Sequence, residues 1–468
     1  MAVRSARAAR AGTATGLSRR LITPMVLGVV LNPINSSIIA VALVPIGVAF
    51  GAPASQTAWL VSALYLATAV GQPVAGRLVD VVGPKPLYLT GAVMVGVAGV
   101  VGATASTLGV LVAARVLLGL GTCAGYPAAM YLIRHDSGDT TPSGPLTVLA
   151  VSGQVVAAVG PTLGGVLIDT GGWQATFLVN VPLALACLVV GTRLPGGARR
   201  RRVRLDTPGM ALFAVALTAL LLFMMSPGRW YLALVAALVG AGFAVRELRV
   251  SDPFVDLRVL GGNWPLLATF WRTLLTFTVS YSFLFGYTQW LEHGRGLAPT
   301  VAGLVLLPMF LVAIVVSAIT GRHPTVRGKL VVGGATLVAG CASLLVVHAG
   351  TPVAALAVIS AVVGVPQGLN SLGNQNALYH QAQPARVAAS AGLLRTFSYL
   401  GAMLAAAAGG AAFGHGADTD GLHELAWLML GCAVLLLVAS VTDRSLRRVG
   451  TQSAPGDRSP GGGQRREQ

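Results

Sequence analysis

Charged and amide side chains lie inside or at the edge of long apolar stretches of this sequence. Burying them in a membrane costs free energy, so each is expected to have a structural or functional role. Arg115 and Arg272 each interrupt such a stretch, and Glu292 stands at the edge of another. A charged side chain at the centre of a bilayer costs about 2.5–3.5 kcal/mol on insertion scales, so it faces a cavity or a partner. Such residues are typical of binding and of charge-coupled gating. The elements that must position them are the apolar stretches themselves.

Fourteen long apolar segments run through the chain. Hydrophobic residues make up 54% of the sequence and charged residues 10%, too little charge to cover a soluble protein. A bilayer core takes roughly 20 apolar residues per helix, and only helices satisfy the backbone of such uniformly apolar spans. We predict an all-α polytopic membrane protein with spans at 22–48, 57–79, 86–105, 107–133, 144–168, 172–193, 207–226, 229–248, 264–291, 298–320, 330–349, 352–379, 386–413 and 422–441.

Basic residues alternate between the two sides of this arrangement. Arg and Lys precede the first span and follow every even-numbered one, whereas the opposite loops hold only Arg229 and Arg295. The positive-inside rule then places both termini in the cytoplasm. Most of the net charge of +17 therefore comes from basic residues that set the orientation of the chain in the membrane. We expect no nucleic-acid partner, because the arginines lie at helix ends and form no soluble basic face. The run from Arg199 to Arg204 predicts an anchor at the lipid surface.

The four cysteines fall inside predicted spans, and we expect them to pack as small apolar side chains. They are Cys123, Cys187, Cys341 and Cys432, at no metal-ligand spacing, so we expect no metal and no cofactor. A bias toward Ala, Gly, Val and Arg indicates a GC-rich bacterium and therefore the bacterial cytoplasmic membrane.

Two loops share a pattern of glycine and basic residues. One is GRLVDVVGPK, from Gly76 to Lys85, and the other is GRHPTVRGK, from Gly321 to Lys329. Similar loops in corresponding places indicate an internal duplication, as in transporters whose halves are related by a pseudo-two-fold axis. The spans at 207–226 and 229–248 are then an inserted hairpin, although they could also form one re-entrant pair.

Two more motifs lie within spans. LVAARVLLGLG places Arg115 four residues before Gly119, and GQVVAAVGPTLGG runs from Gly153 to Gly165. Its Gly160-Pro161 pair frees a backbone carbonyl and kinks a helix. The glycines that follow let a neighbouring helix approach closely.

These motifs resemble those of the major facilitator superfamily, and in particular of its fourteen-span drug:proton antiporter family. The likeness extends over residues 20–445 and includes GGWQATFLVNVP, LDTPGMAL and AGLVLLP. It implies two six-helix bundles with a central two-helix insertion, and an Asp80 that latches one conformation. Val81 and Pro84 stand where basic residues are usual, which implies a weaker latch. The residues implied in gating or coupling are Gly76, Arg77, Asp80, Gly83, Lys85, Arg115, Gly160, Pro161, Gly164 and Gly165.

The first span departs from that family. In INSSIIAVALVP, Asn35 occupies the position of an acidic residue, and an amide does not titrate. No carboxylate lies deep in any predicted span. Glu292, beside His293 at an outer helix end, is the best candidate for a proton site, and the alternative is a solvated loop pair.

Polar residues within spans predict a substrate site near the midplane between the halves. Interhelical hydrogen bonding without substrate is the alternative for each of them. The internal cations Arg115 and Arg272 favour a neutral, zwitterionic or anionic substrate. Arg395 is either a third internal cation or an anchor at the inner end of its span. The predicted site residues are Asn32, Asn35, Tyr65, Gln72, Gln154, Arg272, Tyr281, Gln289, Gln367, Asn370 and Asn374.

The sequence therefore predicts a monomeric exporter of small amphipathic molecules that works by alternating access and exchanges protons. An uncoupled facilitator or uptake carrier stays open because of Asn35. A membrane enzyme acting on lipid-linked substrates would have only His135, Asp136 and Asp139 as a candidate cluster, which lacks a catalytic pattern. The expected division is an arm at 1–21, a bundle at 22–195, a linker and hairpin at 196–262, a bundle at 263–445 and a disordered tail at 446–468.

Overall fold

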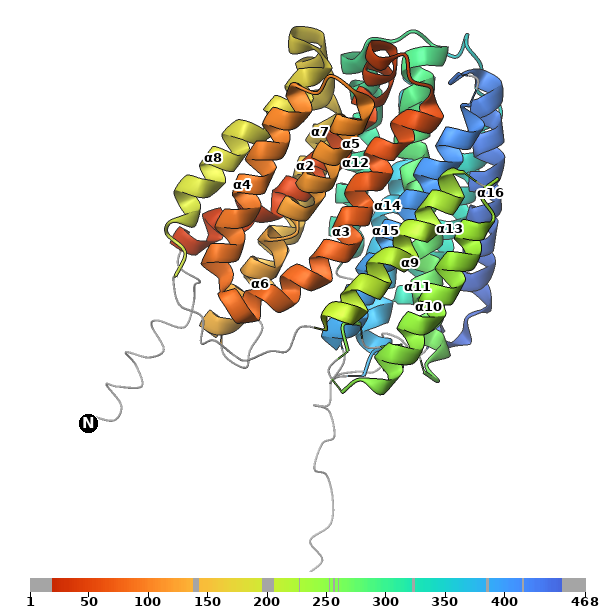
Figure 1. The fold of residues 1–468 in the computed structure, drawn as a ribbon. Coiled ribbons are helices and arrows are strands. Elements are labelled where there is room, and N and C mark those ends of the chain that lie inside the picture. Colours follow the sequence, from red (N-terminus) through yellow and green to blue (C-terminus); the bar gives the residue numbers. More distant parts are fainter. Residues whose placement is uncertain are drawn as a thin grey trace, which may run out of the picture.

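The computed structural model is a bundle of membrane-length helices (Figure 1). It describes residues 19–137, 143–195, 206–226, 228–251, 253–255, 257–259, 261–321, 325–383, 387–414 and 416–447, and these form no strand. The arm, the tail, the Arg199 to Arg204 run and part of the second glycine loop lie outside this set. The side chains of His135, Asp136 and Asp139 lie outside it as well.

The helices follow one another through short connections. They are α2 (Arg19–Phe50), α3 (Ala54–Val82), α4 (Pro84–Ala103), α5 (Leu108–Thr122), α6 (Gly125–Ser137), α7 (Ser143–Leu178), α8 (Asn180–Gly191), α9 (Thr207–Met225), α10 (Tyr231–Arg249), α11 (Trp264–Ser282), α12 (Pro299–Thr320), α13 (Val326–Leu344), α14 (Val353–Gln381), α15 (Val387–Ala412) and α16 (Thr419–Thr442). The helical turns are η1 (Leu257–Val259), η2 (Phe283–Tyr287), η3 (Trp290–Gly294) and η5 (Arg444–Arg447).

Each of the fourteen predicted spans coincides with one helix or with consecutive helices. Eleven stretches of the described chain are long and apolar enough to cross a membrane, and α9 and α10 are two of them. The hairpin therefore consists of two separate membrane-length helices and is not a re-entrant pair. The fifth and sixth spans join at Gly172, whose φ of 69° interrupts α7. Glycine tolerates this conformation because it has no Cβ.

Local sequence explains several helix starts. Side-chain oxygens of Thr107, Asp206, Asn263 and Asp418 accept hydrogen bonds from backbone N–H groups three residues later. These residues are the preferred N-caps, because they satisfy donors that have no partner inside the helix. Proline occupies the first turn of α4, α9, α11 and α12, where its missing N–H costs nothing.

The same packing scheme occurs twice along the chain. In the first half, α4 packs on α5 and α8, and α2 packs on α7. In the second half, α13 packs on α14 and α16, and α11 packs on α15. The halves meet where α7 packs on α12 and α3 packs on α15. Such a repeat agrees with the duplication that the two glycine loops predict.

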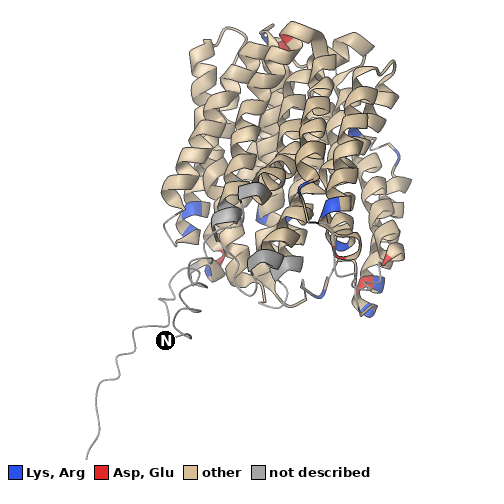
Figure 2. Cartoon of the chain, turned by 90° about the vertical axis from the view of Figure 1, so that its left-hand side faces the viewer, with Lys and Arg blue, Asp and Glu red and all other residues tan. Residues whose placement is uncertain are grey.

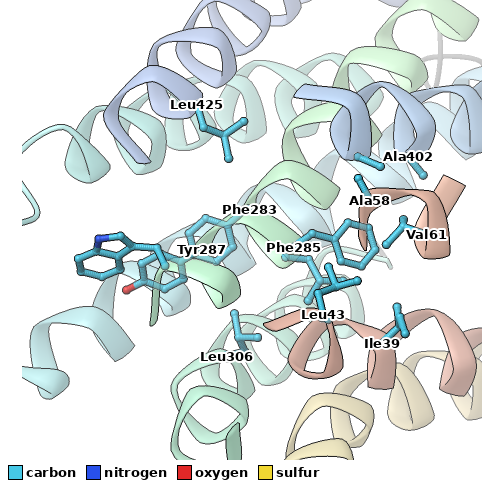
Figure 3. Packing of buried hydrophobic residues seen from close by; sticks show 14 of the residues in the cluster. Ile39, Leu43, Ala58, Val61, Phe283, Phe285, Tyr287, Leu306, Ala402 and Leu425 are labelled. Carbon is cyan, nitrogen blue, oxygen red and sulfur yellow. The ribbon is translucent and has the colours of Figure 1, made fainter. Parts of the chain in front are cut away.

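The two ends of the bundle differ in how the halves meet. We call the end where α2 begins and α16 ends the terminal end, and the opposite one the far end. Toward the far end a single apolar cluster joins both halves, and Figure 3 shows side chains such as Leu43, Phe283 and Leu306 within it. Toward the terminal end, residues around Met25 and Tyr88 form a cluster of the first half, and Val326 and Leu330 belong to another in the second. Beside the hairpin a third cluster joins the halves along α3, α11 and α15.

Basic residues gather toward the terminal end (Figure 2). At this end Asp206 accepts a hydrogen bond from Arg246 at 2.5 Å, which ties the start of α9 to the end of α10. Burial alone raises the pKa of Asp206, but bonds from Arg246 and from the Gly209 N–H lower it below its ordinary value. The hairpin packs on α3 and α15, so it lies beside the seam between the halves.

A buried ion pair fastens the terminal end of the second half. Arg272 in α11 is fully buried, and its Nη1 lies 2.6 Å from Asp443 Oδ2, just after α16. Arg272 Nη2 also donates to Thr269 Oγ1 at 2.6 Å. Burial tends to raise the pKa of Asp443, yet hydrogen bonds from Ser445 and Arg272 and the charge of Arg272 hold it below its usual value. Arg272 is therefore a structural cation of this bundle.

We expect Asp443→Asn to destabilise the purified protein by about 3–5 kcal/mol, because it leaves a buried guanidinium without its counter-charge. Thermal unfolding in detergent measures this, with the exposed Asp420→Asn on the same helix as a matched control. A lowered folded-state pKa means that the stabilisation is complete above the unfolded pKa of about 3.9 and is lost as the pH falls through the folded value. The difference in unfolding stability between the native protein and Asp443→Asn should be present at neutral pH and become smaller only in acid. Equal stability at pH 7 would contradict the role of the pair.

Candidate functional site

An aromatic cluster lies where the two halves meet, in the middle of the bundle. The ring of Tyr65 on α3 lies 5.2 Å from that of Tyr281 on α11 and 5.9 Å from that of Tyr399 on α15. Phe277 and Phe285 extend it, with ring centroids 5.9 and 5.5 Å from Tyr281. Two of the predicted site residues, Tyr65 and Tyr281, are thus brought together from opposite halves.

Polar contacts across the seam accompany this aromatic cluster. Tyr399 donates a hydrogen bond to Gln72 Oε1 at 2.6 Å, joining α15 to α3. About one turn earlier on α15, the Arg395 guanidinium carbon lies 4.2 Å from the ring centre of Tyr126 on α6. The sequence pointed to Gln72 and to an internal Arg395. It did not point to Tyr126 or Tyr399, since an isolated tyrosine in an apolar span gives no signal of its partners.

Arg115 occupies the interior of the first half. Its Nε donates to Leu60 O at 2.9 Å and its Nη1 to Asn35 O at 3.2 Å, while Nη2 is buried without a hydrogen-bond partner. Ser36 Oγ and Tyr65 Oη are buried without partners as well. Within the described chain the ion pairs are those of Arg246 and Arg272, so Arg115 has no carboxylate partner there. The buried cation is therefore compensated only by backbone carbonyls.

The amides of the first span bond within the first half. Asn35 Nδ2 donates to Asn180 Oδ1 on α8 at 2.7 Å and to Leu31 O at 2.8 Å. Asn32 Nδ2 donates to Thr122 Oγ1 at 3.2 Å. In this conformation both side chains are occupied by interhelical hydrogen bonds, which is the alternative that the sequence left open.

The predicted polar face of α14 divides between neighbours. Gln367 Oε1 accepts a hydrogen bond from Ser280 on α11 at 2.5 Å. Asn370 is fully buried against α13, where a Cβ on Gly333 would collide with its Oδ1. Asn374 is also buried, with its Oδ1 unpartnered. Only the intervening Ser371 is exposed, so most of this face points into the second half.

The remaining predicted site residues are scattered. Gln154 on α7 is exposed, whereas Gln289 is buried and donates to Phe285 O within its own helix. Arg272 belongs to the ion pair with Asp443 described above. We therefore do not include Gln289 and Arg272 in the site.

The glycines of α7 bring three helices into backbone contact. A Cβ on Gly160 or Gly164 would collide with Ser37 or Val41 of α2. A Cβ on Gly165 would lie 2.5 Å from Pro299 O of α12, and one on Gly303 of α12 would lie 2.6 Å from Pro161 O. This contact is reciprocal, and Thr162 adds a hydrogen bond to Gly303 O at 3.2 Å. Close packing of this kind requires glycine on both helices.

Glu292 is a buried carboxylate near the far end. It is 7% exposed, and neither of its side-chain oxygens has a hydrogen-bond partner. It interacts electrostatically with Asp169 of α7, which is exposed. The two acids come from opposite halves, so the Glu292 of η3 is not the solvated loop residue of the alternative interpretation.

The predicted loop motif connects neighbouring elements at the terminal end. Arg77 donates to Pro253 O at 2.6 Å, which ties α3 to the segment after the hairpin, and Lys85 donates to Thr192 O at 2.7 Å. Gly83 has a φ of 91° between α3 and α4, a conformation that favours glycine. Asp80 forms no hydrogen bond or ion pair with any residue in the described ranges, so it latches nothing here. A Cβ on Gly76 would meet nothing within 4 Å.

The site has no metal-binding character in the part of the chain that the structure describes. No three His, Cys, Asp or Glu side chains there lie close enough to share an ion. The four cysteines are unpaired, and none of them is exposed. The interior thus offers aromatic rings, amides and guanidinium groups.

Comparisons with known proteins agree with this architecture. The family model of the Major Facilitator Superfamily matches residues 25–406. An uncharacterized MFS-type transporter YwoD of Bacillus subtilis is 32% identical over 84% of this chain and 90% of its own length. The Methylenomycin A resistance protein of Streptomyces coelicolor is 29% identical over 89% and 90%, and other relatives are named as resistance or export proteins.

A solved structure from work on proton-dependent oligopeptide transporters has the same fold. It superposes with a TM-score of 0.68 at 16% identity, and the match covers 92% of this chain and 99% of that one. The helical architecture, the repeated packing and the family match lead to one conclusion: this chain is a transporter-type membrane protein that belongs to the major facilitator superfamily.

Proposed function

We propose that the protein exports small amphipathic molecules across the bacterial cytoplasmic membrane by alternating access, in exchange for protons. The observation that carries this proposal is the closure at the far end, where α7 and α12 meet through glycines above a polar and aromatic centre. Both termini and the basic terminal end then face the cytoplasm. Relatives named as resistance and export proteins support the outward direction.

The polar centre would be reached from the terminal end in this conformation. Gln154, Ser371 and Arg395 are exposed although they lie within membrane-length helices. Polar side chains at that depth are costly in lipid and usually face a cavity, so we place them on the path between the halves. An Asp80 without a partner fits the same state, because the latch that the family resemblance implies would be released when this side is open.

Each half would move as one six-helix bundle, 22–195 against 263–445, with the hairpin beside the seam. The contact between α7 and α12 is built from backbone and small residues, so it can separate without leaving a buried polar group behind. The apolar cluster around Leu43 and Phe283 would separate along with it. A two-state seam of this kind is what alternating access requires.

Glu292 would couple this motion to protons. An unpaired carboxylate is far cheaper to bury when it is neutral than when it is ionised, so closure of the far end favours a protonated Glu292. Opening the far end would expose Glu292 to water and move it away from Asp169 on the opposite half, so ionisation would become less costly and the proton would exchange with the outside. The other titratable groups of the far end near this position are His293, Arg295, Asp418, Asp420, His423 and Glu424.

An uncoupled facilitator is the second candidate, and the bond from Asn35 to Asn180 favours it. The family resemblance implies a titratable carboxylate at this position of the first span. Here an amide occupies the position and forms a structural hydrogen bond. The two candidates differ in whether substrate movement is accompanied by proton movement.

Cross-linking tests alternating access directly. A Cβ on Gly410 would lie 3.1 Å from Ser55 Cα, within reach of disulfide geometry. In a background without the native cysteines, Ser55→Cys with Gly410→Cys should cross-link across α3 and α15, hold the far end closed and abolish transport until a reductant is added. Each single variant is the control. Unchanged transport in fully cross-linked protein would argue against the proposed motion.

Proton coupling is tested in proteoliposomes with an internal pH-sensitive dye. We expect Glu292→Gln to abolish substrate-triggered proton flux while substrate still binds, because an amide cannot exchange the proton. Glu424→Gln, an exposed carboxylate on α16, is the matched control and should behave like the native protein. Substrate flux without proton flux in the native protein would establish the facilitator and refute antiport.

A further inference from the structure

We propose that the substrate is a planar aromatic anion, whose rings stack among Tyr65, Tyr281 and Tyr399 and whose anionic group binds Arg395. This inference deepens the proposed function, because it assigns a substrate class to the same central site. It rests on three independent features of the middle of the bundle: its ring geometry, its cations and the position of its acids.

The aromatic side chains present faces and edges from both halves. Tyr65 and Tyr281 meet edge to face, with 62° between their planes, whereas Tyr281 and Phe285 are stacked at 16°. Offset stacking and edge contacts are the favoured arrangements of aromatic pairs. A flat ring system entering between Tyr281 and Tyr399 would continue the stack, which an aliphatic substrate of the same size could not do.

Arg395 is the cation available beside this cluster. It lies over Tyr126 at 4.2 Å, one turn before Tyr399, and it has no ion-pair partner in the described chain. It is exposed to solvent although protein surrounds it. Arg395 also interacts with the side chains of Tyr126 and Tyr399, which hold it beside the cluster. A guanidinium has five N–H donors, and it can bind a carboxylate with two parallel hydrogen bonds.

Arg115 strengthens the positive field from the opposite half. Its buried Nη2 has no partner, and it interacts with Tyr65, whose ring touches both Tyr281 and Tyr399. The two unpaired guanidinium groups, one in each half, therefore flank the same aromatic cluster.

No described acid lies near the cluster to offset these cations. The described carboxylates all stand at helix ends or beyond them, at Asp80, Asp169, Asp206, Glu247, Glu292, Asp418, Asp420, Glu424 and Asp443. In a medium of low dielectric, charge of one sign attracts an anion and repels a cation strongly. The interior thus selects against lipophilic cations and for anions.

Ligands that differ in a single functional group test which substrate charge the site prefers. Fused-ring scaffolds such as naphthalene and anthracene would each carry a carboxylate, its carboxamide or an aminomethyl group, and calorimetry would measure binding to the full-length protein in detergent. We expect the carboxylate to bind at least tenfold more tightly than the carboxamide on one or more scaffolds, and the aminomethyl compound to bind most weakly. Equal binding of all three, or no carboxylate preference on any scaffold, would overturn the proposal.

Variants of Arg395 test whether this residue binds the anionic group of the ligand. Arg395→Gln should weaken the carboxylate at least tenfold and leave the carboxamide within twofold, so retained carboxamide binding shows that the protein is folded. Arg395→Lys should be intermediate, because an ammonium lacks the bidentate fork. Arg229→Gln removes an exposed arginine of the hairpin turn and should change nothing. A carboxylate preference that survives Arg395→Gln would contradict the assignment.

The aromatic contribution has its own test. Tyr281→Leu should weaken both carboxylate and carboxamide at least fivefold, and Tyr281→Phe should restore most of the loss. Because these readouts measure binding, they are separate from export. A carboxylate preference without outward transport in vesicles would refute the export function alone, whereas outward transport of carboxamides and amines without that preference would refute the substrate class alone.

Discussion

The close approach of α7 and α12 is the contact on which the rest of this structure depends. Gly165 meets the backbone at Pro299, and Gly303 meets the backbone at Pro161, so each helix supplies the gap that the other fills. This reciprocal contact belongs to the pseudo-symmetric seam, and the apolar cluster behind it extends through both halves. The kink-prone Gly160-Pro161 pair lies at the same level. Any larger residue at either glycine would hold the far ends apart.

The distribution of charge follows from the cost of burying it. Arg272 is neutralised by Asp443, and Arg246 by Asp206, at the terminal end. Arg115 and Arg395 have no counter-ion among the described residues of the middle of the bundle, where a substrate could supply one. Glu292 is left without any partner at the far end, where a proton could supply neutrality. In our account, the buried charges that lack partners mark the places where a transported species completes the site.

Much of the fold is predictable from the sequence, because a membrane imposes simple rules on it. Each of the eleven membrane-length stretches of the described chain overlaps a segment that was predicted as a span, and the hairpin between the repeats was expected from the loop motifs. The Gly171-Gly172 pair marks the break between the fifth and sixth spans. These features depend on local composition and on satisfying the backbone in lipid, and neither requires knowledge of distant contacts.

The site was only partly predictable, because helical phase depends on tertiary packing. Tyr65, Gln72 and Tyr281 do meet at the seam, but Asn35 and Asn370 turn into their own halves. Arg272 is neutralised by an aspartate 171 positions away, a pairing that no local pattern reveals. Tyr126 matters only because Arg395 crosses it. A polar residue inside a span shows that a partner exists but does not identify it.

The central claim is that the two halves open and close at opposite ends, and paired distance measurements test it most directly. Spin labels at Ser106 and Ala349 would report on the far end, and labels at Val82 and Thr325 on the terminal end, all at exposed positions. In lipid nanodiscs, double electron–electron resonance should show a short distance between the two far-end labels and a long distance between the two terminal-end labels in the state described here. Lowering the proton concentration or adding substrate should lengthen the first and shorten the second. Two distances that stay fixed, or that change in the same direction, would contradict alternating access.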